Sequence, residues 1–377
     1  MSLKTFQLEF WNSGSNPVSG APCHSGTPLS KAASMPNPKT FSPVGPLRGR
    51  VEIPGDKSIS HRSLMLSALA VGESVIAGLL EGEDVHATAA ALRAMGASIE
   101  RDVNGIWRVH GVGVGGLLQP RTALEMGNSG TSTRLLMGLV ASHDITATFV
   151  GDASLSRRPM ERVSAPLSLM GASFSATPGR GGAQCLPMMV QGACPAVPMT
   201  YRLPMASAQV KSAILLAGLN APGVTRVIEP VPTRDHSERM LRGFGAEIEV
   251  QIETDGTRII AITGEGDLKP QHIVVPGDPS SAAFPVVAAL ITPGSEVTVT
   301  NVGMNPTRAG LFEVLTQMGA DLSFENRRDV GGEPVADIRA RHSRLSGIDV
   351  SPHVAPSMID EFPILFIAAA MAEGVTR

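Results

Sequence analysis

Aromatic residues are scarce in this sequence, at 4% of 377 residues, and small aliphatic side chains and Met take their place. Stacking of nucleic-acid bases on Tyr, Phe or Trp is therefore a poor prospect over most of the surface. The formal net charge of −3 adds no overall attraction for nucleic acid. Any anion site in this protein must accordingly be local.

Cysteine is equally rare, with Cys23, Cys185 and Cys194 forming neither a CxxC motif nor a Cys/His cluster. These counts argue against a zinc site and favour a reducing cytoplasm. The longest apolar run, near Ile364–Ala372, is too short to span a bilayer. We expect a cytoplasmic protein that holds no metal and binds neither nucleic acid nor a membrane.

The first part of the chain differs in composition from the rest. Residues 1–47 are rich in Ser, Pro and Gly, show no periodicity, and have no apolar core behind a basic start. We interpret them as a disordered N-terminal extension. A transit peptide is a second interpretation, because the segment is rich in Ser and poor in acidic residues.

An internal repeat of about 75 residues runs through the remaining sequence. Four segments each combine an apolar helix end, a Gly-Ala pair and an alternating strand start. Their glycines, Gly96, Gly171, Gly245 and Gly319, are 75, 74 and 74 residues apart. A glycine in this position is typical of a helix C-terminus in the left-handed conformation. The spacing predicts several similar α/β units rather than a short-period solenoid.

A second series of segments alternates with the first. Each has a small or hydroxyl residue at the start of an apolar helix, then a turn, then a β-rich strand. The helix starts carry free N–H groups and a partial positive charge, so several of them facing one cleft would attract an anion. The opening serines are Ser58, Ser129, Ser207, Ser280 and Ser357.

The first of these starts, IPGDKSISHR, has cations that the others lack. Lys57 stands at the predicted helix start, and Arg62 follows one turn later. Together with Ser58 they predict a site for a phosphate or a carboxylate. The related stretch VVPGDPSSAAF has no cation near Ser280 in the sequence, and we expect it to be a simple helix cap.

Two further stretches carry candidate anion ligands. GDASLSRRPM places Arg158, after Arg157, just before a predicted helix, where bidentate recognition of an anion favours Arg. A solvated basic loop is the alternative. MASAQVKSA offers Ser207 and Gln209 at a helix start, whereas Lys211 is compatible with a residue that faces solvent.

Acidic candidates lie in TRDHSERM and PSMIDEFPIL. In the first, Asp235 is interpreted as a helix N-cap and His236 as structural, beside Arg234. In the second, Asp360 and Glu361 are placed in a strongly apolar helix, where a carboxylate needs a partner or a purpose. We favour Asp360 as a general base.

These motifs together resemble one known family. PGDKSISHR, GNSGTSTR, RRPM, MASAQVKSA, TRDHSE, PGDPSSAAF and MIDEFP are similar to those of 5-enolpyruvylshikimate-3-phosphate synthase, over about residues 46–377. Within that family the sequence is closest to the bacterial branch that contains glyphosate-tolerant forms. The family transfers the enolpyruvyl group of phosphoenolpyruvate to the 5-hydroxyl of shikimate 3-phosphate in the shikimate pathway, which leads to chorismate and the aromatic amino acids.

The resemblance implies an α/β fold, a two-domain inverse α/β barrel built from six βαβαββ units. About four and a third of the six units are expected here. It also implies a discontinuous, incomplete domain of residues 48–56 plus 270–377 and a continuous substrate-binding domain of residues 57–269.

The resemblance further implies roles for single residues. Lys57, Ser58 and Arg62 would hold shikimate 3-phosphate, with Lys57 also reaching phosphoenolpyruvate. Asp360 would take the proton from the 5-hydroxyl, and no cofactor would be required. The other implied substrate-binding residues are Asn128, Gly130 and Arg158 for phosphoenolpyruvate, and Ser207, Ala208, Gln209 and Arg234 for shikimate 3-phosphate.

One departure from the family pattern lies at the C-terminus. The family continues with a Lys-Glu-Ser-Asp-Arg motif and later Arg and Lys residues that contact phosphoenolpyruvate, and these do not follow Arg377 here. We therefore expect the chain alone to be impaired, or to be completed by a C-terminal fragment.

Two rival functions stay open at this point. A non-catalytic fragment that binds shikimate 3-phosphate is one. UDP-N-acetylglucosamine enolpyruvyl transferase, which shares the fold, is the other. That enzyme has a reactive Cys in the loop before an Arg-Pro pair, and the equivalent loop GDASLSRRP has none.

Overall fold

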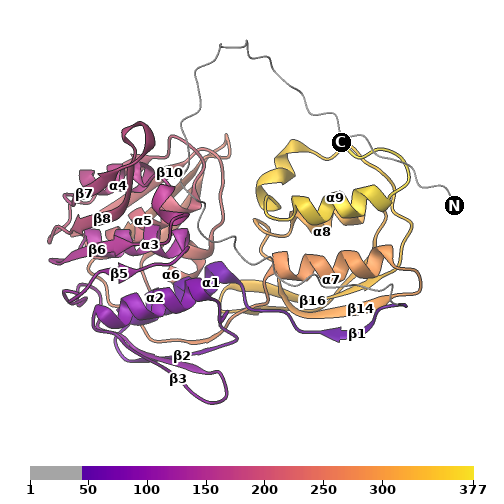
Figure 1. Cartoon of the computed structure of the whole chain (residues 1–377), viewed down its shortest axis with the longest axis horizontal. Helices are drawn as coiled ribbons and strands as arrows, with labels where there is room; N and C mark the ends of the chain where they lie inside the picture. Colours follow the sequence, from indigo (N-terminus) through magenta and orange to yellow (C-terminus); the bar gives the residue numbers. More distant parts are fainter. Residues whose placement is uncertain (1–44) are drawn as a thin grey trace, which may run out of the picture. The chain divides into compact units, whose positions relative to one another are not determined.

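Four sheets of four strands each form the framework of this computed structural model, which describes residues 45–377 (Figure 1). Every sheet has the same plan, in which one parallel strand pair is extended by two antiparallel pairings. The repeat predicted from the glycine spacing is therefore confirmed. Of the segment 1–47, residues 1–44 lie outside the described residues.

Two of the repeats are continuous in the sequence. Each runs strand, helix, strand, helix and antiparallel hairpin, with sheet orders β5-β6-β8-β7 and β9-β10-β12-β11. The elements of the first are β5 (Leu124–Glu125), α3 (Gly130–Ala141), β6 (Thr146–Val150), α4 (Glu161–Leu169), β7 (Ser173–Pro178) and β8 (Gln184–Gln191). Those of the second are β9 (Thr200–Arg202), α5 (Ala208–Gly218), β10 (Val224–Glu229), α6 (His236–Gly243), β11 (Ile248–Ile252) and β12 (Arg258–Thr263).

The other two repeats exchange their first strands. Strand β1 (Arg48–Val51) precedes α1 in the sequence but pairs with β14, and β13 (His272–Val274) precedes α7 but pairs with β2. The chain therefore crosses between these two repeats twice. One repeat also contains α1 (Lys57–Leu69), β2 (Glu73–Ala77), α2 (Glu83–Ala94), β3 (Ser98–Arg101) and β4 (Trp107–His110). The other contains α7 (Pro279–Ile291), β14 (Glu296–Gly303), α8 (Gly310–Gln317), β15 (Asp321–Val330) and β16 (Glu333–Arg341).

A fifth repeat begins after β16. Residues 346–350 and 373–377 run parallel, joined by bonds such as that from the Gly347 N–H to the Glu373 carbonyl, 2.7 Å. Between them lie the 3₁₀ helix η3 (Pro352–Ser357) and α9 (Phe362–Met371), which lies against α7 (Figure 1). Short 3₁₀ helices also occur at Leu155–Arg157 (η1) and Arg180–Gly182 (η2).

The four repeat glycines have the conformation that the sequence predicts. In chain order, from Gly96 to Gly319, their φ angles are +102°, +105°, +86° and +90°. Residues other than glycine rarely adopt this region. Each follows the C-cap residue of α2, α4, α6 or α8, so each ends a helix and redirects the chain into a strand. These residues are Gly96, Gly171, Gly245 and Gly319.

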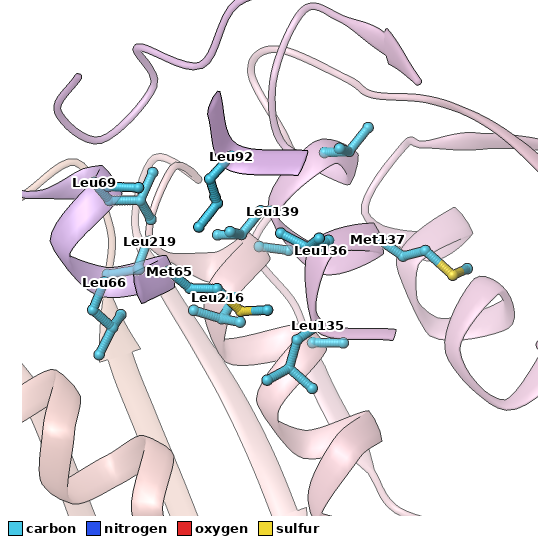
Figure 2. Packing of buried hydrophobic residues seen from close by; sticks show 14 of the residues in the cluster. Met65, Leu66, Leu69, Leu92, Leu135, Leu136, Met137, Leu139, Leu216 and Leu219 are labelled. Atoms are coloured by element: carbon cyan, nitrogen blue, oxygen red, sulfur yellow. The ribbon is translucent and has the colours of Figure 1, made fainter. Parts of the chain in front are cut away.

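The helices α1, α3 and α5 form the centre of the larger hydrophobic core. Leucines and methionines of α1 and α3 meet Leu216 of α5 and Leu219 just beyond it (Figure 2). Every residue of α1 from Ile59 to Leu69 is buried, so this helix has no solvent-facing side. Burial of each such apolar side chain contributes about 1.5–3 kcal/mol. A second core surrounds α7, α8 and α9. The predicted division into residues 48–56 plus 270–377 and residues 57–269 stays a prediction.

Candidate active site

The starts of α1, α3 and α5 hold most of the predicted site residues, whereas Arg158, Arg234 and Asp360 lie outside these helices. Asp56 caps α1 by accepting a hydrogen bond from the Ile59 N–H at 2.9 Å, while Ser129 and Ser207 cap α3 and α5. Ser58 is therefore the second helical residue rather than the cap. The hydroxyl of Ser58 and the first-turn N–H groups that these caps leave free are consequently available to an anion.

Lys57 lies at the first position of α1. Its side chain is 46% exposed, and its ammonium group pairs with the carboxylate of Asp84 in α2. Arg62, one turn later, is buried and bonds inward. It donates to the Ser237 and Ser212 hydroxyls at 2.7 and 2.8 Å and to the Ser58 carbonyl at 3.0 Å. Burial lowers the pKa of Arg62 to about 10, which keeps it charged at neutral pH.

The starts of α3 and α5 are joined by a residue that the sequence analysis missed. Arg134 donates to the side-chain oxygen of Gln209 at 3.0 Å, and the Gln209 amide donates to the Thr131 hydroxyl at 3.1 Å. Burial lowers the pKa of Arg134, and nearby Arg162 and Arg158 add to this effect. The position of Arg134, one turn after Gly130 in the same predicted helix, is the feature of the sequence that could have identified it.

Asn128, Gly130 and Arg158 lie together at the start of α3. Arg158 donates to the Asn128 side-chain oxygen at 2.5 Å. A Cβ atom added to Gly130 would lie 2.8 Å from Nη1 of Arg134 and 3.1 Å from Nη1 of Arg158. Glycine at this position thus lets two guanidinium groups approach the start of α3.

Asp360 lies in a turn before α9, not inside the apolar helix as expected. Its carboxylate is 54% exposed and pairs with Arg234 at 2.5 Å. The neighbouring Glu361 is the buried acid, and burial raises the pKa of Glu361 although the Ser280 hydroxyl and Arg308 oppose this. Asp360 therefore reaches the surface with a cationic partner, whereas Glu361 belongs to the interior.

Two expectations about cations were wrong. Lys211 does not face solvent: it is completely buried and pairs with Glu229 at 3.0 Å and Glu238 at 2.7 Å. Ser280 does have a cation nearby, because Arg308 donates to its hydroxyl at 2.8 Å. Both errors concern partners far away in the sequence, so local sequence reasoning had no access to them.

A buried hydroxyl network connects α1, α2 and α3 behind the site. His61 Nδ1 lies 2.8 Å from the Thr88 hydroxyl and 3.2 Å from that of Ser132, which in turn lies 2.5 Å from Ser129. The other ring nitrogen of His61, Nε2, is buried without a partner. Burial lowers the pKa of His61 to about 3, and the nearby charges of Lys57 and Arg62 add to this effect.

This histidine predicts a loss of stability in mild acid. The unfolded chain binds a proton near pH 6.5 and the folded chain only near pH 3, so the free energy of unfolding falls as pH decreases from 6.5. His61 alone contributes at most about 1.4 kcal/mol per pH unit to this slope, which is measured by urea unfolding at pH 7 and pH 5. His61→Asn should flatten the slope. Part of the slope should remain in this variant, because burial also lowers the pKa of His143.

The same substitution at exposed His110 is the matched control and should keep the wild-type slope. A His61→Asn slope equal to that of the wild type would contradict this account.

Residues 45–377 contain no cluster of three His, Cys, Asp or Glu side chains that could hold a metal ion. In the same range, no helix has the length and apolar character needed to cross a membrane.

Comparisons with known proteins agree with the motifs. The family model described as EPSP synthase (3-phosphoshikimate 1-carboxyvinyltransferase) matches residues 41–377. The chain is 74% identical over 339 residues to the 3-phosphoshikimate 1-carboxyvinyltransferase of Sphingopyxis alaskensis, which covers 90% of this chain and 76% of the relative. The corresponding protein of Novosphingobium aromaticivorans is 70% identical over the same shares. None of these matches supports the expectation that the chain alone is impaired.

Solved structures give the same result for the fold. EPSP synthase from Acinetobacter baumannii superimposes with a TM-score of 0.80 at 52% identity, covering 89% of this chain and 74% of that one. The enolpyruvyl transferase NikO from Streptomyces tendae shares the fold, with a TM-score of 0.67 at 20% identity. The predicted enolpyruvyl transferase fold is confirmed, and the chain belongs to the EPSP synthase family.

Proposed function

We propose that this chain transfers the enolpyruvyl group of phosphoenolpyruvate to the 5-hydroxyl of shikimate 3-phosphate and releases phosphate. The observation that carries the proposal is the cluster at the starts of α1, α3 and α5. There Lys57, Arg134 and Arg158, from the motifs PGDKSISHR, GNSGTSTR and RRPM, bring three cations to helix N-termini. Both substrates are anions, and helix starts with cations suit them.

Shikimate 3-phosphate is assigned to α1 and α5. Lys57 and Ser58 bind it from the start of α1, and Arg62 contributes from behind Ser58. Ser207, Ala208 and Gln209 bind it from the start of α5, with Arg234 nearby. The N–H groups of two first turns and one ammonium group then share the phosphate charge.

Phosphoenolpyruvate is assigned to the start of α3. Asn128, Gly130 and Arg158 meet its charged groups, and Lys57 reaches it from α1. Fixed cations and helix ends in this position stabilise the negative charge that develops during transfer.

Asp360 is assigned the role of general base. It takes the proton of the substrate 5-hydroxyl. For this, Arg234 must share or release the Asp360 carboxylate with which it pairs. The freed oxygen attacks C2 of phosphoenolpyruvate while C3 gains a proton, which gives a tetrahedral intermediate. Loss of the C3 proton and of phosphate from C2 then forms the enol ether. Proton transfer by a positioned carboxylate contributes about 10²–10⁴-fold to such a rate.

The direct test is phosphate release by the 377-residue chain with both substrates, alongside calorimetry with shikimate 3-phosphate. Turnover that requires both substrates supports the proposal. Binding without turnover favours the non-catalytic alternative, including a chain that a C-terminal fragment completes. Turnover with UDP-N-acetylglucosamine instead of shikimate 3-phosphate favours the other transferase, although loop 151–158 has no Cys. A cytoplasmic location stays a prediction from the low cysteine content.

Gly130 predicts sensitivity to glyphosate. Tolerant members of the family are expected to carry a bulkier residue here, which crowds the inhibitor. In Gly130→Ala the new Cβ must displace the guanidinium groups of Arg134 and Arg158. We expect the inhibitory concentration of glyphosate to rise about tenfold, equivalent to about 1.4 kcal/mol, with a smaller rise in the KM for phosphoenolpyruvate.

Steady-state inhibition assays at fixed phosphoenolpyruvate measure this effect. The control is Gly127→Ala, where the added Cβ meets nothing within 4 Å, although its φ of +54° adds backbone strain. Equal inhibition of the wild type and Gly130→Ala would contradict the prediction.

A further inference from the structure

The two Pro-Gly-Asp motifs of the sequence meet at the point where the chain crosses between repeats. The Asp56 N–H donates to the Pro276 carbonyl at 2.7 Å, and the Asp278 N–H donates to the Pro54 carbonyl at 2.9 Å. Gly55 and Gly277 form an antiparallel bridge between them. The motifs therefore bind each other reciprocally, and each ends in the aspartate that caps a helix, α1 or α7.

One buried arginine binds both aspartates. Arg308 is 4% exposed; its Nη1 lies 3.2 Å from Asp56 Oδ2 and its Nη2 lies 3.0 Å from Asp278 Oδ1. The planar guanidinium presents two donors in fixed directions, so it can satisfy two carboxylates at a set separation. Arg308 thereby fixes the starts of α1 and α7 relative to each other.

The same arginine continues to the turn that carries Asp360. Its Nη2 donates to the Ser280 hydroxyl at 2.8 Å, and that hydroxyl donates to Glu361. Nη2 also lies 3.8 Å from the Glu361 carboxylate itself. Glu361 is 2% exposed and directly follows Asp360 in the chain. A continuous chain of contacts therefore runs from the cap of α1 to the residue beside the proposed base.

We propose that Arg308 is a positioning residue for the transfer reaction. It holds the start of α1, with Lys57 and Ser58, in register with the turn that holds Asp360. This inference rests on the proposed function for its effect on rate. The structural claim, that Arg308 holds the caps of α1 and α7 and the turn before α9 together, does not depend on that function. Arg308 itself touches neither substrate, and a displacement of about 1 Å at the reacting groups costs about 10²-fold in rate.

The first test is Arg308→Lys. Lysine keeps the charge but is a point charge that cannot bridge Asp56 and Asp278 with the same fork. We expect kcat to fall about 100-fold and the affinity for shikimate 3-phosphate to change less than about threefold. A residue with a purely structural role would lower the melting temperature without lowering the kcat of the folded enzyme. Arg341→Lys, which weakens an ion pair with Asp321 between β16 and β15, is the control and should retain kcat.

Ser280→Ala provides a milder second variant if Arg308→Lys does not fold. It removes only the hydroxyl that connects Arg308 to Glu361 and leaves both aspartate contacts in place. We expect kcat to fall about tenfold, with unchanged binding of shikimate 3-phosphate. Because both changes interrupt one chain of contacts, the double variant should lose less than the product of the two effects.

Amide hydrogen exchange keeps the test independent of turnover. The N–H groups of Ile59 and Ser280 donate to the side-chain carboxylates of Asp56 and Asp278. The Leu365 N–H donates to the backbone carbonyl of Glu361 and so reports on the start of α9. We expect all three to exchange about tenfold faster in Arg308→Lys, and only the Leu365 amide to do so in Ser280→Ala. If exchange is faster in the variants but the wild-type chain itself shows no turnover, the proposed function is rejected and the structural role of Arg308 is retained. Unchanged exchange, or a folded Arg308→Lys enzyme with wild-type kcat, would overturn the inference.

Discussion

Asp360→Asn is expected to reduce kcat about 10³-fold while leaving the affinity for shikimate 3-phosphate within a few-fold of the wild type. Asparagine has almost the same size, and the replaced carboxylate is more than half exposed, so the fold should not change. What is lost is the ability to accept a proton from the 5-hydroxyl. Phosphate release under saturating substrates measures the first quantity, and calorimetry measures the second.

The control for this variant is Asp349→Asn in the same repeat. Asp349 is 75% exposed, pairs with Arg377 at 3.3 Å, and is assigned no role in the reaction. Its kcat should equal that of the wild type. If Asp360→Asn loses less than tenfold in kcat, the base is another group and Asp360 serves the Arg234 contact instead.

Local features of the sequence predicted the repeats well. Gly96 and its three counterparts end helices because a positive φ is a property of one residue and needs no distant partner. The serines at 129 and 207 cap helices for the same reason. Such signals survive in any tertiary context, so their spacing revealed the architecture.

The exchange of β1 and β13 could not be predicted from residue patterns. Either strand is short and fits either sheet by its own composition, and the choice depends on which parallel partner it finds. The same limit applied to Arg308, which lies about 250 residues from Asp56 in the sequence. Its separation from the motifs gave no hint that it binds both of them.

Asp360 and Glu361 illustrate a third kind of limit. The sequence placed both in one apolar helix, and the structure separates them into an exposed acid and a buried one. Helix boundaries shift by a residue or two with capping and with Pro363 at the start of α9, and one residue decides which side chain faces inward. The assignment of Asp360 rather than Glu361 as the base therefore rests on exposure as well as on the motif.

Lys211→Met is expected to lower the free energy of unfolding by about 3–5 kcal/mol, because it leaves the Glu229 and Glu238 carboxylates buried without their cation. All three side chains are at most 4% exposed, so water cannot replace the ammonium group. Urea unfolding measures the loss. Lys57→Met is the matched control: Lys57 is half exposed and its pair with Asp84 is a surface ion pair, worth at most about 1 kcal/mol.

The triple variant Lys211→Met, Glu229→Gln and Glu238→Gln separates lost attraction from stranded charge. Most of the cost of removing one partner from a buried ion pair comes from the charge that is left behind, so neutralising both acids should restore more than half of the lost stability. Glu229 also accepts bonds from the Thr233 N–H and hydroxyl, directly before Arg234, and glutamine can keep its side-chain oxygen there. If the triple variant is no more stable than Lys211→Met, the stabilisation comes from the contacts of Lys211 itself rather than from charge balance.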